Sequence, residues 1–311
     1  MKKIFSFILL ILFLCSCSHE QTEDIYILFT NDVASAMNNG VSYAGVKAYK
    51  DQLLAEHPFV ALVDAGDYFD GDISVLSSGA DIVTVMNAVG YDVVTLGNQE
   101  FSVGLDHLKE NIGNSQFDYV SCNLLYKGSG KDPLKAVKPY FIKKFGKVRV
   151  AFIGVTTPET LIPDKPAYDA ITIDGQPVYS FYEHDEGQEL YDQVQKTVNK
   201  VRNRAEYVIV LSHLGSNSVT EGFSSYDLIA NTTGIDVVID AHSHTEISGE
   251  AVANKDGTGV VLTSAGEHLN NLGELILHTN HTYTTTLYPS VYGRDDYVQA
   301  VVDGIYASWN E

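Results

Sequence analysis

Short apolar runs alternate with longer amphipathic stretches along this chain. The apolar runs are rich in Val, Ile and Leu and lie at residues 25–29, 59–63, 92–96, 207–211 and 236–240. Near-continuous runs of this kind are typical of parallel strands that are buried on both faces. The stretches at 43–57, 80–90 and 187–204 have helical spacing and are long enough for the crossovers that parallel strands require.

Other segments predict antiparallel strands. Residues 140–155 form a candidate hairpin around Gly146, and residues 260–291 resemble successive strands. Together with the parallel strands, these segments predict a mixed α/β architecture with two sheets packed face to face between helices. The last stretch, 294–311, predicts a terminal helix with one apolar side, formed by Val298, Val301, Val302 and Ile305.

The N-terminus has the order of a secretory signal. Lys2 and Lys3 precede an apolar run, which is followed by small residues and two cysteines. The run is shorter than the about 20 residues that a membrane-spanning helix needs. "LCSC" at 14–17 resembles a bacterial lipobox. We therefore expect a lipoprotein signal peptide over residues 1–16.

This signal predicts where the protein is located. Cys17 would be the first mature residue and would carry the lipid, and the polar residues 17–24 would form a short tether. The protein would be exported and anchored to a membrane on its extracytoplasmic side. Cys15 would leave with the signal, so Cys122 would remain as the one ordinary cysteine and no intramolecular disulfide would form.

Length and charge limit the classes of function. Roughly 295 mature residues of ordinary apolar content suffice for one large domain or two small ones, and no repeat or linker follows the tether. We therefore expect a single domain over 25–293. The net charge is −20 without any basic cluster, which argues against a nucleic-acid partner. A small anionic substrate would also be repelled unless the site contains a cation.

Side chains that bind metals follow all five predicted parallel strands. They are Asp32, Asp67, Asn98, His213, and the pair His242 and His244. In open α/β sheets, ligands bind beyond the carboxyl ends of the strands. In extended backbone, residues i and i+2 face the same side, so both histidines of the pair are expected to point into one cavity. Carboxylates combined with imidazoles suit Zn, Mn, Fe or a similar divalent ion.

Each of these residues also has an ordinary explanation. Asp32 or Asn98 would serve equally as a helix cap or a turn residue. A single histidine such as His213 is more often a core or surface residue than a ligand, and Asp64 would serve simply to brace its loop. Agreement among five strand ends favours a metal site, because independent caps would not all use metal-binding side chains.

Five ordered motifs resemble those of the calcineurin-like metallophosphoesterases: "FTND", "DAGD", "TLGNQEF", "LSHLG" and "IDAHSHT". The segments "YAGVKAYKDQL", "MNAVGYDVVTLGN" and "LTSAGEHLNNLGEL" narrow this resemblance to the 5'-nucleotidase branch. The resemblance covers about residues 24–278. It implies a four-layer αββα sandwich of two mixed sheets flanked by helices, and a two-metal site that hydrolyses phosphate esters, typically of nucleotides.

The resemblance also assigns roles to individual residues. The site would hold one or two divalent ions, and Asp67 would be the carboxylate that bridges them when two are bound. Asn98, His213 and His242 would complete one metal shell, and Asp32 and His244 would hold the other ion.

Three positions depart from the family's pattern. Ala34 stands where a ligand His is expected at the second metal, and Gln99 stands at the position of the catalytic His. Ser102 replaces the Asp that pairs with that His, and Ala241 replaces a Gly, which is a smaller change. Gln99 can donate a hydrogen bond to a phosphate oxygen but cannot deliver a proton, and general acid–base assistance is worth about 10²–10⁴ in rate.

One hypothesis restores the lost ligand. Ser35, Asn38, Asp70 or a water would then fill the coordination position that Ala34 leaves vacant; the alternative is that these are ordinary loop residues. In the 5'-nucleotidase branch, a second domain supplies the nucleoside pocket, and the helix at 294–311 resembles the connector to it. We therefore expect that pocket to be absent or to come from a separate chain.

Three interpretations of function follow. The first is a lipid-anchored phosphoesterase that acts on phosphate esters such as nucleotides with reduced or altered activity. The second is a catalytically inactive lipoprotein that binds metal or phosphate, or that partners a separate nucleoside-binding chain. The third is a plain α/β lipoprotein without metal, which the five strand ends disfavour.

Overall fold

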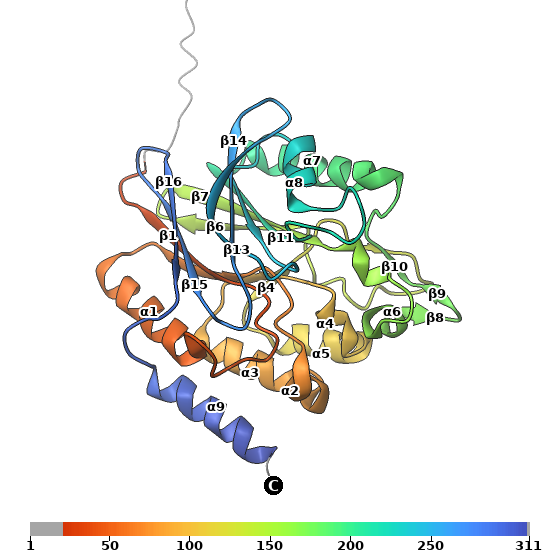
Figure 1. Ribbon diagram of the computed structural model, residues 1–311, viewed down its shortest axis with the longest axis horizontal. Coiled ribbons are helices and arrows are strands. Elements are labelled where there is room, and N and C mark those ends of the chain that lie inside the picture. The colour runs from red at the N-terminus through yellow and green to blue at the C-terminus, as the bar shows by residue number, and fades with distance from the viewer. Residues whose placement is uncertain (1–20, 310–311) are drawn as a thin grey trace, which may run out of the picture.

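The structure is a computed structural model that describes residues 21–309, without the side chains of residues 72, 73 and 75 (Figure 1). The predicted signal peptide, the predicted lipidation site Cys17 and the first part of the predicted tether lie outside the described residues. The predicted end of the tether, residues 21–24, is instead attached to the domain. Gln21 Nε2 donates to Leu277 O at 2.7 Å, and Gln21 Oε1 accepts from the Tyr207 hydroxyl at 2.6 Å.

Two six-stranded mixed sheets form the centre of the molecule. In the first sheet the order is β16 (Tyr283–Tyr288), β15 (Leu272–Leu277), β1 (Ile25–Thr30), β2 (Val60–Asp64), β3 (Val93–Thr95) and β4 (Asp118–Val120). In the second sheet it is β13 (Glu246–Ala253), β14 (Gly259–Ala265), β12 (Val237–Asp240), β11 (Tyr207–His213), β7 (Val148–Thr156) and β6 (Tyr140–Phe145).

The strand directions explain where the site can form. In the first sheet, β1, β2, β3 and β4 are parallel, while β15 and β16 are antiparallel additions at one side. In the second sheet, β7, β11, β12 and β14 are parallel, and β6 and β13 pair antiparallel at the two edges. The carboxyl ends of the parallel strands therefore meet at a common edge of each sheet.

Helices cover the outer face of each sheet. On the first sheet they are α1 (Ser42–Glu56), α2 (Gly71–Ser77), α3 (Ala80–Val89), α4 (Gln99–Ser102), α5 (Leu105–Asn114) and α9 (Asp296–Ser308). On the second sheet they are α7 (Gln188–Arg202) and α8 (Ser225–Asn231). Figure 1 shows the two groups of helices on opposite sides of the paired sheets. The predicted four-layer αββα sandwich is confirmed.

Side-chain alternation in the strands produces this layering. In β1, Ile25, Ile27 and Phe29 enter the apolar cluster between the two sheets, whereas Leu28 faces the cluster under the helices of the first sheet. In β11, Ile209 and Leu211 face the first sheet, and the neighbouring residues face α7. These strands are buried on both faces, as their continuous apolar runs predicted.

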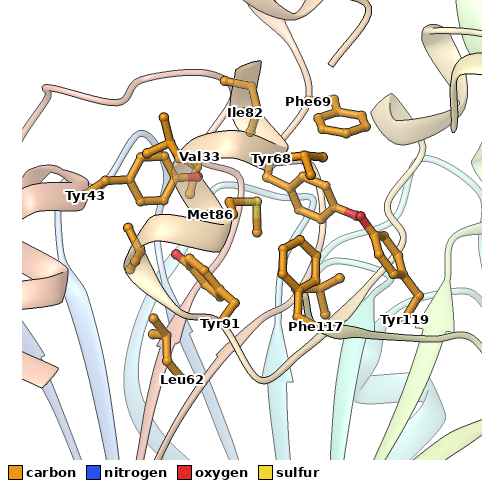
Figure 2. Packing of buried hydrophobic residues seen from close by; sticks show 14 of the residues in the cluster. Val33, Tyr43, Leu62, Tyr68, Phe69, Ile82, Met86, Tyr91, Phe117 and Tyr119 are labelled. Carbon is orange, nitrogen blue, oxygen red and sulfur yellow. The ribbon is translucent and has the colours of Figure 1, made fainter. Parts of the chain in front are cut away.

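Aromatic side chains fill the layer between the first sheet and its helices. Figure 2 shows Met86 of α3 among the rings of Tyr43, Tyr68, Tyr91 and Phe117, all of them buried. This packing holds the segment after β2, which contains Tyr68, against the helical layer. Asp67, next to Tyr68 in the chain, is thereby carried on a rigid loop.

The C-terminal helix α9 packs on the domain. Val298, Val302 and Ile305 are buried against the layer that contains α1 and α3, whereas Val301 is half-buried. The predicted apolar side of this helix is therefore largely covered. Within the described residues, no helix is both long enough and apolar enough to cross a membrane.

A segment of short elements covers the carboxyl end of β7. Its elements are the 3₁₀ helix η1 (Pro158–Leu161), α6 (Pro166–Ala170), β8 (Thr172–Ile173), β9 (Gln176–Pro177), β10 (Tyr179–Ser180), which pairs with β5 (Leu125–Tyr126), and the 3₁₀ helix η2 (Asp185–Gly187). The helix α6 packs against α4, which begins at Gln99. This segment therefore forms one wall beside the strand ends.

Candidate metal centre

Three of the predicted ligands come together between the two sheets. Asp67 follows β2 of the first sheet, while His213 ends β11 and His242 follows β12 of the second. One ligand atom from each lies within 4.8 Å of the other two. Asp67 and His213 are buried and His242 is half-buried. This grouping is small enough for one divalent ion.

The hydrogen bonds of His213 fix which nitrogen faces the site. Its Nδ1 donates to Ala65 O at 2.8 Å, which leaves Nε2 directed inward, 3.1 Å from Asp67 Oδ2. Burial lowers the pKa of His213, but the charge of Asp67 outweighs burial and raises this pKa to about 10. The proton on Nε2 thus balances a buried carboxylate, and a divalent cation can take over that role.

The carboxylate of Asp67 is held by the chain around it. Asp67 Oδ1 accepts from the backbone N–H of Gln99 at 2.8 Å. Burial acts to raise the pKa of Asp67, but the charge of His213 and its hydrogen bonding lower it. The Asp67 carboxylate is therefore ionised and ready to bind a cation.

Asn98 and Gly97 support the assignment of a metal site. Asn98 Oδ1 is buried and has no hydrogen-bond partner among the described residues. Buried polar atoms without partners are rare in folded proteins. A Cβ at Gly97 would lie 2.1 Å from Asp67 Oδ1 and 2.7 Å from His213 Nε2, so only glycine leaves room for these side chains. The residues present therefore fit a metal ion.

The second predicted pair, Asp32 and His244, lies beside this group. His244 Nε2 is 3.8 Å from Asp32 Oδ1, and His244 Nδ1 is 2.8 Å from Glu267 Oε2. The Asp32 carboxylate also accepts from the backbone N–H of His242 at 2.9 Å. Burial raises the pKa of Asp32. His244 is about half exposed, so this side of the site is more open than the first.

The extended backbone that we expected at the histidine pair is wrong. His242 and His244 have φ of 76° and 55°, and Asp32 and Asp67 have φ of 49° and 58°. These values lie in the left-handed region, which costs non-glycine residues of order 1–3 kcal/mol each and is concentrated at functional sites. Four of the six predicted ligands are therefore held in strained backbone, and the surrounding hydrogen bonds, rather than strand pleating, orient the pair.

The three side chains proposed to replace the imidazole lost at Ala34 all make other hydrogen bonds. Ser35 Oγ bonds to Ser74 Oγ at 2.6 Å and to the backbone of Asp70. Asn38 Oδ1 accepts from Gln299 Nε2 at 3.1 Å. The Asp70 side chain caps α2 by accepting from the Gly71 N–H at 2.7 Å. These residues therefore act as ordinary loop and cap residues.

Gln99 and Ser102 form a pair of their own. The Ser102 hydroxyl donates to Gln99 Oε1 at 3.0 Å, across one turn of α4. The resemblance predicted a His and an Asp at these two positions. The Gln99 carbonyl oxygen accepts this bond, so its amide N–H groups remain as donors for a ligand. This pair can donate a hydrogen bond to an oxygen atom of a ligand, but it cannot transfer a proton at the pH of a cell.

Two acidic residues that the sequence did not single out hold the site together. Glu100 is buried and accepts from the backbone N–H groups of Phe69, Asp67 and Gly97 at 3.0, 3.0 and 2.6 Å. Burial raises the pKa of Glu100 to about 8. The one indication of this role in the sequence was that Glu100 directly follows Gln99.

Asp64 has the bracing role that was considered for it, because its carboxylate accepts from the Gly66 N–H at 2.7 Å.

Glu159 of η1 is the second acidic residue that the sequence did not single out. Its Oε2 lies 2.9 Å from His242 Nε2. Its Oε1 accepts from the Ser218 hydroxyl and from the N–H groups of Val219 and Thr220 at 2.8, 2.8 and 3.1 Å. Burial acts to raise the pKa of Glu159, but hydrogen bonds from His242 and Ser218 lower it to about 2. No signal in the sequence pointed to this contact, since Glu159 and His242 are 83 positions apart.

A cavity of about 400 Å³ opens beside the candidate ligands. It is lined by Asn98, Gln99, Ser102, Glu159, Ile162, Lys165, Pro166, Ala167, Val219 and His242. A larger cavity of about 550 Å³ includes Tyr179 and Tyr182, from the tyrosine-rich region, but contains none of the candidate ligands. The smaller cavity is therefore the one in which a substrate would meet the metal site.

Known proteins resemble this chain in sequence and in fold. Residues 54–271 match the family model described as bacterial capsule synthesis protein PGA_cap. A snake venom 5'-nucleotidase from Gloydius brevicauda is 30% identical over 239 residues, which cover 71% of this chain and 37% of that protein. The chain thus spans less than half the length of the curated relatives it matches.

Two solved structures share the fold. The 5'-nucleotidase precursor from Thermus thermophilus has a TM-score of 0.76 and 22% identity, over 92% of this chain and 59% of that chain. The calcineurin-like phosphoesterase YfkN from Bacillus subtilis has a TM-score of 0.72 and 22% identity, over 92% of this chain and 97% of that chain. The matched family model shows that the chain belongs to the PGA_cap family, and its fold is shared with the 5'-nucleotidase precursor and the calcineurin-like phosphoesterase.

Proposed function

We propose that this protein is a metal-dependent phosphoesterase that hydrolyses phosphate esters, such as nucleotides, with reduced or altered activity. The grouping of Asp67, His213 and His242 within 4.8 Å supports this proposal most directly. The partnerless Asn98 Oδ1 beside them, among the described residues, adds a fourth candidate ligand. The names of the relatives support the substrate class, since several are nucleotidases.

The proposed metal ligands form two sets. Asp67, Asn98, His213 and His242 would hold one divalent ion, and Asp32 and His244, with Asp67, would hold a second ion less tightly because Ala34 provides no ligand. Bound divalent ions would polarise the phosphoryl group and lower the pKa of a bound water toward neutrality. The chain itself orients these ligands through Ala65, Glu100, Glu159 and Glu267.

Gln99 and Ser102 limit the reaction. The Gln99 amide can donate to a phosphoryl oxygen in the cavity, but neither of these two residues can protonate a leaving group. Esters with good leaving groups, which leave without protonation, should therefore react best. The same pair favours a second candidate function, in which the protein binds metal and phosphate without turnover.

One experiment separates these two functions. The purified protein would be assayed for bound metal and for hydrolysis of an aryl phosphate, a phosphodiester and nucleotides, beside the triple variant Ala34→His, Gln99→His, Ser102→Asp. We expect slow hydrolysis of the aryl phosphate by the native protein and an increase of about 10²–10⁴ in the triple variant. Native turnover no greater than that of a His242→Ala control would favour the binding function, and a protein that binds no metal would contradict both.

We also propose that the protein acts on the extracytoplasmic side of a membrane, through a lipid on Cys17. The signal-like order of residues 1–17 supports this location. A Cys17→Ser variant should then leave the membrane fraction of cells, and one that stays there would contradict the anchor.

A further inference from the structure

A cavity that binds an anionic phosphate ester needs positive charge, and the His expected at the position of Gln99 is not there to supply it. The net charge of the protein is −20, and the candidate ligands include Asp32 and Asp67. Gln99, which stands at the position of the expected His, is neutral at every pH. A further cation besides the metal would therefore help an anionic phosphate ester to approach the cavity beside the metal site.

Lys165 lines this cavity together with Asn98, Gln99, Ser102 and His242. Among the described residues that line it, Lys165 is the one lysine or arginine. The remaining lining is neutral polar or apolar, apart from Glu159 and His242. The position of Lys165 thus brings a full positive charge to the cavity that Gln99 also lines.

The segment that carries Lys165 is fixed at both ends. On one side, Glu159 binds His242 and the loop at 218–220. On the other side, Ala167 is buried in α6, which packs against α4. Pro166 directly follows the lysine and restricts its backbone. The base of the side chain is therefore held in place, so less conformational freedom is lost when a ligand binds.

Acidic neighbours do not neutralise this lysine. Within the part of the chain that the structure describes, the lysine and arginine ion pairs involve Lys47, Lys50, Lys143, Arg149 and Arg202, and not Lys165. The one carboxylate in the cavity lining, Glu159, has both oxygens engaged by other donors. The ammonium of Lys165 is therefore available to an incoming anion.

We propose that Lys165 is a substrate-binding residue whose ammonium, together with the Gln99 amide, binds the phosphoryl oxygens of a phosphate monoester in this cavity. This inference rests on the proposed function and specifies the substrate class of the same site. A phosphate monoester is a dianion near neutral pH, whereas a phosphodiester carries one negative charge. Lys165 therefore favours monoesters over diesters.

Inorganic phosphate is the probe that tests this role. Its affinity for the Mn²⁺-loaded protein would be measured by calorimetry in the wild type and in the Lys165→Ala, Lys165→Arg and Lys144→Ala variants. Lys144 is an exposed lysine of β6 that lines none of the cavities described above. Loss of a hydrogen bond to a charged group should weaken phosphate binding about 10–100-fold in Lys165→Ala. Lys165→Arg should retain most of the affinity, and Lys144→Ala should match the wild type.

Kinetics provides an independent readout. In Lys165→Ala, KM for an aryl phosphate monoester should rise by a factor similar to the loss of phosphate affinity, whereas KM for an aryl phosphodiester should change less. Bound metal should remain at the wild-type level, because Lys165 is not among the candidate ligands.

The two proposals fail in different ways. If Lys165→Ala binds phosphate as tightly as Lys144→Ala, or if the wild type binds no phosphate, the role of Lys165 is overturned. If phosphate affinity falls in Lys165→Ala but the wild type hydrolyses no ester, Lys165 remains a phosphate-binding residue and the proposed catalytic function fails.

Discussion

At the scale of single residues, Glu159 connects a candidate metal ligand to the loops around it. One carboxylate oxygen lies 2.9 Å from His242 Nε2, and the other accepts from three donors at residues 218–220. A carboxylate in this position keeps the proton of His242 on Nε2, which leaves Nδ1 free to bind a metal. Glu159 is thus a positioning residue for the site.

Glu159→Gln should weaken metal binding while it preserves the shape of the side chain. The glutamine oxygen can still accept from Ser218 and the loop, but its amide group would donate toward His242 Nε2 and so favour the wrong tautomer. We expect the affinity for Mn²⁺ or Zn²⁺ to fall about 10–100-fold, as is usual when a residue that orients a ligand is changed. Titration calorimetry measures this loss.

The matched control for this variant is Glu183→Gln. Glu183 accepts from Ser180 and Phe181 within its own turn, away from the candidate ligands. Its variant should bind metal like the wild type. Equal affinities for the two variants would show that Glu159 does not position His242.

At the scale of elements, the turn between β3 and α4 determines the site. Gly97 and Asn98 lie in this turn, and Gln99 and Glu100 begin α4. Gly97 makes room for two ligands and Asn98 offers an oxygen. Gln99 lines the cavity, and Glu100 holds the Asp67 loop. Four consecutive residues can serve the site because β3 ends at the edge of the sheet and α4 begins shortly after it.

Gly97→Ala should disrupt the metal site more than the fold. The added Cβ would lie 2.1 Å from Asp67 Oδ1 and 2.7 Å from His213 Nε2, so both side chains would have to move. We expect metal binding to be lost and unfolding free energy to fall by about 1–3 kcal/mol, the usual cost of overpacking. Metal analysis of the purified variant and denaturant unfolding test this outcome.

Gly113→Ala provides the comparison. Gly113 lies in α5, where nothing would lie within 4 Å of an added Cβ. Alanine there should stabilise the helix by about 0.5–1 kcal/mol and leave metal binding unchanged. If Gly97→Ala retained full metal content, the proposed crowding at the site would be refuted.

At the scale of the whole molecule, the candidate ligands join the two sheets. Asp67 and Asn98 belong to the first sheet and His213 and His242 to the second, so a bound ion would link both halves of the sandwich. An ion that binds only the folded state stabilises it according to its free concentration. Metal should therefore act on global unfolding and not merely on one loop.

Mn²⁺ at about 100 times its Kd should add about 2.7 kcal/mol to the unfolding free energy. Calorimetric scanning should show a higher Tm with metal, and chelation should reverse it. His213→Ala should abolish the shift, whereas His107→Ala, a change of an exposed histidine on α5, should retain it. A shift of equal size in both variants would place the stabilising ion elsewhere.

At a fixed Mn²⁺ concentration, the size of this shift should depend on pH. In the metal-free protein the pKa of His213 is raised from 6.5 to about 10. Its protonation therefore stabilises the fold fully below pH about 6.5 and ceases to do so as pH rises through about 10. The same proton competes with metal for Nε2, so the metal-induced rise in Tm should grow as pH increases. A shift that shrank with rising pH would contradict this linkage.

The sequence by itself determined the layers and the set of residues that meet at the site. Apolar runs such as 207–211 are buried on both faces, so they predicted central strands between two layers. Because the carboxyl ends of parallel strands lie at one edge of a sheet, the side chains at the ends of β2 and β3, and those at the ends of β11 and β12, were expected to approach one another. Asp67, Asn98, His213 and His242 were found on this basis, and the motifs of the family strengthened it.

Only the tertiary structure decided how those side chains are held. The hydrophobic periodicity did not indicate the left-handed backbone of His242 and His244 or their partners Glu159 and Glu267. It also did not indicate the other hydrogen bonds made by Ser35, Asn38 and Asp70. The place of Lys165 beside Gln99 likewise depends on the packing of α6 on α4. Periodicity records the burial of each position within its own element, whereas hydrogen-bond partners depend on which distant segments the folded chain brings together.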